Sequence, residues 1–287
     1  MNNSAFPSEV YLNGSWLKTE EAKISVFDRG FMHGDGIYEV TPFYNGMAFL
    51  LEDHLERLNY CLEQIGLNFD TSEIKNLVYE ALERAGLSNS DAAVYMQISR
   101  GMAPRTHFIP NDIQPTFLMY AFPATLEGFE NKSWKVLLSK DLRWHRCDIK
   151  TTSWLANTMA NSKSHELGLN ETILYRDQVI TEGSHSSIFF IKGNSIYTHP
   201  EGPAILLGIT RKFVIGLCRE LGIEIREKPV LLSEIGNIDE IFCTGTTTQI
   251  MQVNEMIFEG KSVFKNCRKS ETLKKLQSAF KEKTLKL

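Results

Sequence analysis

The chain has 287 residues, of which 43% are hydrophobic and 23% charged, a balance typical of a globular protein with about two domains. Its net charge of −4 gives no electrostatic case for nucleic-acid binding, and no apolar run reaches the ~18 residues of a membrane span. The five cysteines are scattered and never spaced C-x-x-C, which indicates reduced thiols and a cytoplasmic protein. Nucleic-acid and membrane partners are therefore not expected.

The first third of the chain mixes strand and helix patterns. The pairs Asn13-Gly14 and Asn45-Gly46 each separate two short apolar runs, which indicates β-hairpins. Apolar residues at helical spacing follow Asp53, so a helix is expected there. The patterns further predict a helix at residues 72–85 and buried strands at residues 92–99 and 116–122.

The composition shifts at residues 123–128, which we interpret as an interdomain linker. The prediction is an N-terminal α/β domain of residues 1–122 and a C-terminal domain of residues 129–287. In the second domain, one helix is expected to end at Gly168 and another to start near Thr210. Strands are expected near residues 134–138, 172–175, 187–191, 195–197 and 239–244, with a helical basic tail.

Most common catalytic signatures are absent from this sequence. It has no P-loop, no complete dinucleotide fingerprint, no H-E-x-x-H and no G-x-S-x-G. The seven histidines show no metal-ligand spacing, so no metal site is expected.

Three other features point to a phosphate-bearing ligand. Gly208-Ile209-Thr210-Arg211 opens a predicted helix, whose free N–H groups can bind an anion. Thr244-Gly245-Thr246-Thr247-Thr248 ends a buried strand, where ligands of α/β proteins usually lie. Lys150 follows a predicted strand, and a partly apolar setting lowers the pKa of a lysine and favours Schiff-base chemistry. Taken singly, each is more often an ordinary helix start, a polar loop or a surface lysine. The residues alone thus allow an α/β enzyme with a phosphate ligand.

Taken together with other blocks, these features resemble the class IV aminotransferases, the pyridoxal 5′-phosphate (PLP) enzymes of fold type IV. The similarity is greatest to the D-amino acid aminotransferases. It implies an α/β fold of the α+β type with two domains and the cofactor in the cleft between them. The blocks that carry the resemblance are Asp28-Arg29-Gly30, Gly34-Asp35-Gly36-Ile37-Tyr38-Glu39-Val40, Tyr44-Asn45-Gly46, His54-Leu55-Glu56-Arg57-Leu58, Pro104-Arg105-Thr106-His107, Arg143-Trp144-His145-Arg146-Cys147-Asp148-Ile149-Lys150, Thr181-Glu182-Gly183-Ser184, Gly208-Ile209-Thr210-Arg211 and Thr246-Thr247.

The resemblance implies roles in holding the cofactor. Lys150 would form the Schiff base and then move a proton between the substrate Cα and the cofactor C4′. Glu182 would keep the pyridine nitrogen protonated, and the delocalised charge of Arg57 suits the phosphate. The other expected cofactor contacts are Leu206 on the ring face and Ile209, Thr210 and Thr246 at the phosphate.

The resemblance also implies a substrate site and a homodimer. Tyr38 and Thr247 would lie on the substrate side of the cofactor. Arg105 and His107 would reach in from the dimer partner and bind the substrate α-carboxylate, which a bidentate arginine suits. The implied reaction exchanges amino and keto groups between a D-amino acid, such as D-glutamate or D-alanine, and 2-oxoglutarate or pyruvate.

Other activities on the same scaffold stay open. Branched-chain L-amino acid enzymes carry Gly-x-Arg after the Tyr/Phe-Glu pair, but here Tyr38-Glu39 is followed by Val40-Thr41-Pro42. An (R)-amine transaminase and an aminodeoxychorismate lyase are further alternatives, and a non-catalytic binding protein is a third class. The non-catalytic class is disfavoured because Lys150, Glu182 and Arg57 are all present.

Three positions depart from the D-amino acid pattern. His185 stands where the relatives have a serine, and we expect it either to change the protonation of the cofactor or to be a packed histidine. Gly245 replaces a serine before the two threonines, which removes a hydroxyl group. Pro42 is expected to interrupt the strand after Tyr38, because proline fits only the edge or a bulge of a sheet.

Overall fold

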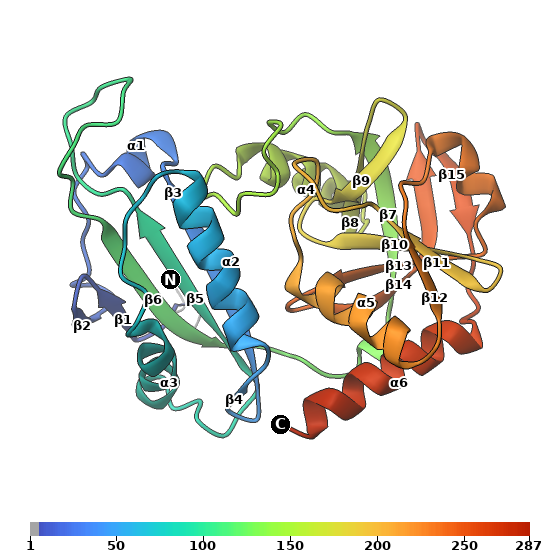
Figure 1. Ribbon diagram of the computed structural model, residues 1–287, viewed down its shortest axis with the longest axis horizontal. Coiled ribbons are helices and arrows are strands. Elements are labelled where there is room, and N and C mark those ends of the chain that lie inside the picture. The colour runs from blue at the N-terminus through green and yellow to red at the C-terminus, as the bar shows by residue number, and fades with distance from the viewer. Residues whose placement is uncertain (1–5) are drawn as a thin grey trace. The chain divides into compact units, whose positions relative to one another are not determined.

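The computed structural model describes residues 6–287, which divide into two compact units. The first unit consists of the chain up to Thr125 together with Ile149–Trp154 and Leu287. The second unit consists of Leu126–Asp148 and Leu155–Lys286. The chain first changes unit inside the predicted linker, while the short segment that carries Lys150 packs with the first unit. The domain limits themselves remain a prediction. Each unit has a mixed α/β structure with one sheet, which confirms the predicted fold class (Figure 1).

The first unit is built on a six-stranded antiparallel sheet in the order β2-β1-β6-β5-β3-β4. Figure 1 shows α2 lying along the strands of this sheet. The strands are β1 (Glu9–Leu12), β2 (Ser15–Lys18), β3 (Gly36–Tyr44), β4 (Met47–Ala48), β5 (Ala92–Ser99) and β6 (Thr116–Pro123). The helices are the short α1 (Arg29–His33), α2 (Leu51–Gln64) and α3 (Ile74–Arg84).

The two faces of this sheet differ, because successive side chains of a strand point to opposite sides. Ile37, Val94 and Met119 belong to the core that packs with α2 and α3. On the other face Tyr38 stacks on Tyr95 with ring centroids 5.7 Å apart, so β3 presents an aromatic surface there. β3 is the strand that links the apolar core to the side chains of interest for function.

The second unit is built on a nine-stranded sheet. Its order is β12-β11-β10-β13-β14-β7-β8-β9, and β15 pairs with β14. The pairs β7–β8, β7–β14 and β11–β12 are parallel, and the others are antiparallel. The strands are β7 (Ser133–Lys140), β8 (Glu171–Arg176), β9 (Val179–Gly183), β10 (Ser187–Lys192), β11 (Ser195–Thr198), β12 (Glu224–Glu227), β13 (Glu240–Gly245), β14 (Gln249–Phe258) and β15 (Lys261–Lys265).

Helices and short 3₁₀ turns complete the second unit. They are α4 (Leu155–Glu166), α5 (Ile209–Glu220), α6 (Glu271–Leu285), η2 (Phe129–Asn131) and η3 (Leu232–Asn237). α5 packs on β13 and α6 on β14, while α4 lies beside β7 and β8 (Figure 1). None of the helices in residues 6–287 combines the length and the hydropathy needed to cross a membrane.

The sequence predicted most elements but was wrong about Pro42. β3 continues through Pro42 to Tyr44 without a break. The neighbouring strand β4 pairs with β3 at Phe43 and Tyr44, so Pro42 lies beyond the end of that ladder. The Phe49 N–H donates to the Pro42 carbonyl on this side at 3.0 Å, so the missing N–H of proline costs no ladder hydrogen bond there.

Candidate active site

Lys150 lies against Tyr38 in the first unit. The Lys150 carbonyl accepts a hydrogen bond from the Tyr38 N–H at 3.1 Å, and Thr151 forms an isolated bridge with Ile37. The Lys150 Nζ atom lies 4.0 Å from the centroid of the Tyr38 ring, within the range of a cation–π contact. β3 therefore holds the lysine backbone and presents an aromatic face to its amino group.

Arg57 is buried on α2 beside a glutamate that the sequence analysis did not single out as a site residue. The Arg57 Nε and Nη2 atoms donate to the two carboxylate oxygens of Glu39 at 2.7 and 2.9 Å. His54 Nδ1 lies 2.7 Å from Glu39 Oε2. Burial works to raise the pKa of Glu39, but Arg57 and His54 outweigh it and lower this pKa to about 2. Glu39 is thus an anion that fixes Arg57 in place.

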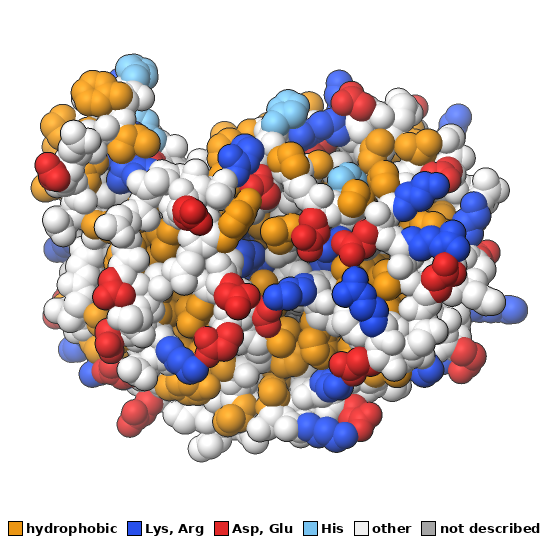
Figure 2. Space-filling view, viewed as in Figure 1, with side chains coloured by type: hydrophobic (Ala, Val, Ile, Leu, Met, Phe, Trp, Pro, Cys, Tyr) orange, Lys and Arg blue, Asp and Glu red, His pale blue; other side chains and the backbone are white. Residues whose placement is uncertain are grey.

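Arg105 and His107 lie on the loop between β5 and β6. Both side chains are exposed, as are Phe108 and Ile109 after them. Figure 2 shows hydrophobic and histidine side chains gathered at the tip of this loop. The loop thus presents a basic and apolar surface to its surroundings.

Glu182 is buried at the end of β9 in the second unit. The Arg143 Nη1 atom donates to it at 2.7 Å, and the Leu206 N–H lies 3.0 and 3.1 Å from its two oxygens. The other edge of the Arg143 guanidinium binds Asp141, through Nε and Nη2 at 3.0 Å each. Burial and, less strongly, the nearby Asp141 charge raise the pKa of Glu182 to about 7, although Arg143 acts to lower this pKa. This carboxyl changes its charge near neutral pH.

The start of α5 lies close to Glu182 in space, although the two are far apart along the chain. Leu206 binds Glu182, and Ile209 and Thr210 begin the helix as buried residues. Among the described residues, no side-chain hydrogen bond caps this helix at Gly208. The first N–H groups of a helix have no partner within the helix, so the start of α5 suits an anion.

Thr246 follows β13 beside the same helix start. A Cβ atom at Gly208 would lie 2.7 Å from the Ser187 hydroxyl, and Ser187 pairs with Thr244 in the sheet. The Thr244 hydroxyl is buried and, within residues 6–287, has no hydrogen-bond partner. Thr246 is half-buried and Thr247 exposed. The structure therefore gathers Glu182, Leu206 and the two phosphate-type motifs at one place in the second unit.

His185 binds a glutamate other than Glu182. Its Nδ1 atom lies 2.9 Å from Glu171 Oε2, and its ring centroid is 5.9 Å from that of Trp134. Glu171 also accepts hydrogen bonds from the hydroxyls of Ser184 and Ser186 at 2.5 and 2.7 Å. The turn after Glu182 is thus fixed around a buried carboxylate.

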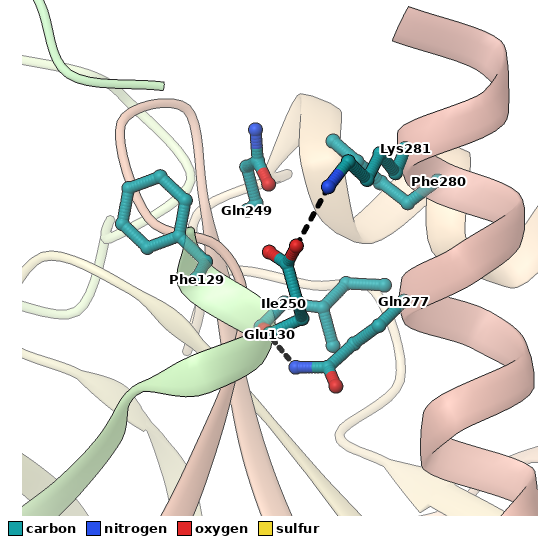
Figure 3. Close-up of a pocket in the computed structure, with 7 residues that line it drawn as sticks. All are labelled: Phe129, Glu130, Gln249, Ile250, Gln277, Phe280 and Lys281. Carbon is teal, nitrogen blue, oxygen red and sulfur yellow. Dashed lines mark hydrogen bonds and ion pairs between the residues drawn. The ribbon is translucent and has the colours of Figure 1, made fainter. Parts of the chain in front are cut away.

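The second unit also has a small pocket. It lies between η2, β14 and α6, and no predicted site residue lines it (Figure 3). Its polar side chains bind one another or the backbone: Lys281 Nζ lies 2.7 Å from Glu130, and the Gln277 amide donates to the Ile250 carbonyl at 2.8 Å. These contacts attach α6 to η2 and to β14.

The sequence analysis missed the residues that surround the predicted ones. Glu39 and His54 carried a signal, because a glutamate in an apolar strand and a histidine three positions before Arg57 suggest buried pairing. Arg143 and Glu171 gave no comparable signal, since Arg143 is 39 positions from Glu182 and Glu171 is 14 positions from His185.

Comparisons with known proteins identify similar chains and folds. A model of the amino-transferase class IV family matches residues 36–256. A D-alanine aminotransferase from Bacillus licheniformis is 38% identical over 251 residues, which cover 86% of this chain and 88% of that protein.

Two solved structures have similar folds. The branched-chain aminotransferase of Thermoproteus uzoniensis, solved with norvaline, has a TM-score of 0.86 and 25% identity, and the match covers 97% of this chain and 95% of that one. A hypothetical aminotransferase from Mycobacterium tuberculosis in its PLP-bound form has a TM-score of 0.81 and 18% identity, covering 96% and 99%. The second likeness concerns the fold alone.

Proposed function

This chain belongs to the class IV aminotransferases, and we propose that it is the PLP-dependent transaminase that exchanges amino and keto groups between a D-amino acid and a 2-oxo acid. The observation that carries the proposal is the buried Glu182 carboxyl, with its pKa near 7, beside the start of α5, which no side chain of residues 6–287 caps at Gly208. A pyridine nitrogen and a phosphate group are the two features of PLP that such an acid and such a helix start would bind.

The residues of both units fit PLP by their chemistry. When bound, PLP supplies an aldehyde that reacts with amines and a ring that accepts the electron pair left at the substrate Cα. We propose that Lys150 binds the cofactor aldehyde and that Glu182 binds the pyridine nitrogen. The proposed phosphate contacts are Arg57, the backbone N–H groups of Ile209 and Thr210, and Thr246. Leu206 is proposed to contact the ring.

Lys150 is the proposed base. Its amino group lies 4.0 Å from the centroid of the Tyr38 ring, which places it beside β3. The lysine is proposed to release and take up a proton at the substrate Cα. Tyr38 limits the positions that the amino group can reach, so the proton is removed from one side.

Glu182 is the proposed partner of the pyridine nitrogen. Burial raises the pKa of its carboxyl to about 7, although Arg143 acts to lower this pKa. A cationic N–H group next to Glu182 would draw it to the ionised form. The acid would then hold a proton at the pyridine nitrogen throughout the reaction.

The preference for D-amino acids is supported by the curated relatives and by the β5–β6 loop. The relative from Bacillus licheniformis is a D-alanine aminotransferase. Arg105 and His107 are proposed to bind the α-carboxylate, and Thr247 to lie on the substrate side. D-alanine or D-glutamate is the proposed donor and 2-oxoglutarate or pyruvate the acceptor.

We further propose a homodimer in the cytoplasm. The Asp28–Met102 bridge joins the segment before α1 to the β5–β6 loop. Four exposed apolar side chains lie on these two segments: Phe27, Phe31, Met102 and Phe108. An apolar surface of this kind is typical of a protein–protein contact. A partner subunit seated on it would bring the loop of one subunit close to the other.

An absorbance titration tests the substrate class. Protein loaded with PLP is mixed with D-glutamate, L-leucine or an (R)-arylamine, and the yellow lysine-bound form is followed as it converts to the pyridoxamine form. We expect D-glutamate to bleach the band and the other two to leave it. The Arg105→Ala, His107→Ala double variant should lose the response to D-glutamate but keep its yellow colour.

Branched-chain L-amino acid transfer is the second candidate, favoured by the fold of the Thermoproteus uzoniensis enzyme. Bleaching by L-leucine alone would transfer the protein to that group and leave Lys150, Glu182 and Arg57 in their roles. Protein that takes up no PLP at all would contradict the cofactor assignment.

A further inference from the structure

The β5–β6 loop, residues 100–115, is anchored at its base by the segment before α1. Asp28 forms a bridge with Met102, and the Ala103 N–H donates to the Phe27 carbonyl at 3.2 Å. Beyond Ala103 the chain runs outward, and residues 104 and 105 and 107–109 are exposed. A loop of this kind is mobile unless something holds its outer part.

Arg29 reaches the outer part of the loop. Its Nη1 atom donates to the Thr106 carbonyl at 3.3 Å. Thr106 lies between Arg105 and His107, the two residues proposed to bind the substrate carboxylate. The Thr106 hydroxyl in turn donates to the Phe108 carbonyl at 2.9 Å, which shapes the turn that follows.

The guanidinium of Arg29 is itself fixed. Its side chain is 6% exposed, and its Nε atom donates to Asp35 Oδ2 at 2.8 Å. The Arg29 backbone N–H donates to the Gly101 carbonyl at 2.9 Å. The fork of arginine carries donors in fixed relative directions, so Arg29 can bind Asp35 with one donor and the loop with another.

Asp35 connects Arg29 to the end of α2. Arg100 Nε lies 2.9 Å from Asp35 Oδ2, and Arg100 Nη1 and Nη2 donate to the carbonyls of Gly66 and Ile65 at 3.1 and 2.7 Å. Burial works to raise the pKa of Asp35, but hydrogen bonds from Arg100 and Arg29 outweigh it and lower this pKa. An ionised, doubly paired carboxylate therefore holds Arg29 against the frame of the first unit.

We propose that Arg29 is a positioning residue for substrate binding, which holds Thr106 so that Arg105 and His107 keep the geometry needed to bind the α-carboxylate. This inference rests on the proposed function, because it takes the loop to be the carboxylate site. Arg29 acts through the loop backbone and needs no contact with substrate. A carboxylate site that is held loosely loses affinity, because binding must then order it.

Replacing Arg29 with lysine tests whether the role of Arg29 depends on its guanidinium group or only on its positive charge. Arg29→Lys keeps the positive charge beside Asp35, but its single amino group does not reproduce the rigid fork that engages both Asp35 and Thr106. Arg84→Lys is the matched control, because Arg84 lies in the same unit on the exposed pair with Glu80, away from the loop. Asp35→Asn is the second variant, which releases Arg29 from its anchor if Arg29→Lys does not fold.

The experiment combines steady-state kinetics with hydrogen exchange on the PLP-loaded protein. For Arg29→Lys we expect KM for D-alanine and for 2-oxoglutarate to rise about tenfold, with kcat within about twofold and cofactor absorbance unchanged. Backbone amides of residues 103–109 should exchange faster, while those of β5 and β6 keep their rates. Arg84→Lys should match the wild-type protein in every measurement.

Unchanged loop exchange and unchanged KM in Arg29→Lys would overturn the inference. Failure of the proposed function has a different signature, which Arg105→Ala reveals. If that variant keeps the wild-type KM, the loop is not the carboxylate site, whatever the exchange data show. Faster loop exchange in Arg29→Lys together with a raised KM in both variants supports the inference and the site on which it rests.

Discussion

Glu39 in the first unit and Glu182 in the second are both buried, and each accepts a hydrogen bond of 2.7 Å from an arginine. Their pKa values nevertheless lie on opposite sides of the usual range for glutamate, at about 2 for Glu39 and about 7 for Glu182. Burial alone raises both pKa values, so the surroundings must account for the difference.

The arginine is used differently in the two clusters. Arg57 gives two donors to Glu39, and His54 gives the same carboxylate a third contact. Arg143 gives two donors to Asp141 and one to Glu182, so its charge is shared between two carboxylates.

The comparison shows how one buried pair can be structural and another reactive. The charge of Glu39 is balanced by its own protein neighbours, and its role is to fix α2 and Arg57. The charge of Glu182 is balanced only in part, so this carboxyl has capacity left for a cationic partner. We therefore expect the two residues to fail in different ways when they are changed.

Glu39→Gln is expected to act on stability. It leaves Arg57 charged and buried without its carboxylate, which typically costs about 3–5 kcal/mol. Chemical denaturation measures the loss in the free energy of unfolding. Glu80→Gln, which breaks an exposed pair with Arg84, serves as the control and should stay within about 1 kcal/mol of wild type. Equal losses in the two variants would show that the buried Glu39–Arg57 pair contributes no more to the free energy of unfolding than an exposed pair does.

Glu182→Gln is expected to act on catalysis. Loss of a charged partner for the pyridine nitrogen should lower kcat/KM by about 100- to 1000-fold, the range found when one preorganised electrostatic contact is removed. Arg143 keeps its two bonds to Asp141, so the free energy of unfolding without cofactor should fall by less than about 1 kcal/mol. A Glu182→Gln variant that loses stability but keeps its activity would show that Glu182 has a structural role.

The stability that Glu39 contributes should depend on pH and be lost in acid. A folded-state pKa of about 2, below the ordinary 4.5, means that Glu39 contributes stability that is present above pH ~4.5 and is lost as the pH falls through ~2. The contribution amounts to roughly 3 kcal/mol. Unfolding of wild type and Glu39→Gln, compared between pH 7 and 2, should give curves that converge in acid. Parallel curves would contradict the low pKa.

Asp141→Asn is expected to give the smallest change. Removing the Asp141 charge takes away a repulsion and leaves Arg143 free to act more strongly on Glu182, so the pKa of Glu182 should fall from about 7, by roughly one pH unit. Difference infrared spectroscopy of the carboxyl band in the protein without cofactor can follow this pKa. A pKa that stays the same or rises would mean that sharing of Arg143 does not explain the difference between the two glutamates.

Local patterns predicted much of the fold. A hairpin signal predicted β3, helical spacing predicted α2, and apolar runs predicted β5 and β6, and the structure confirms them. β14 was missed because it is a central strand with neighbours on both sides, so its side chains do not alternate between apolar and polar. β9 was missed because it is short and ends in Thr181-Glu182-Gly183, which looks like a turn.

The candidate site was predicted in part by resemblance and by helix-start chemistry. The pairing partners were not, because they depend on tertiary packing. Glu39 meets Arg57 across 18 positions, and Arg143 meets Glu182 across 39, so spacing within one element carries no information about either pair. Similarly, nothing in the sequence around His185 indicates Glu171 on β8 as its partner.

The enantiomer of the amino acid product tests the central proposal most directly. PLP-loaded protein is incubated with 2-oxoglutarate and either D-alanine or L-alanine, and the glutamate formed is resolved by chiral chromatography, with Lys150→Ala as the control. We expect D-glutamate from D-alanine, no glutamate from L-alanine and no product from Lys150→Ala. Formation of L-glutamate from the L-donor, or undiminished product in Lys150→Ala, would contradict the proposed function.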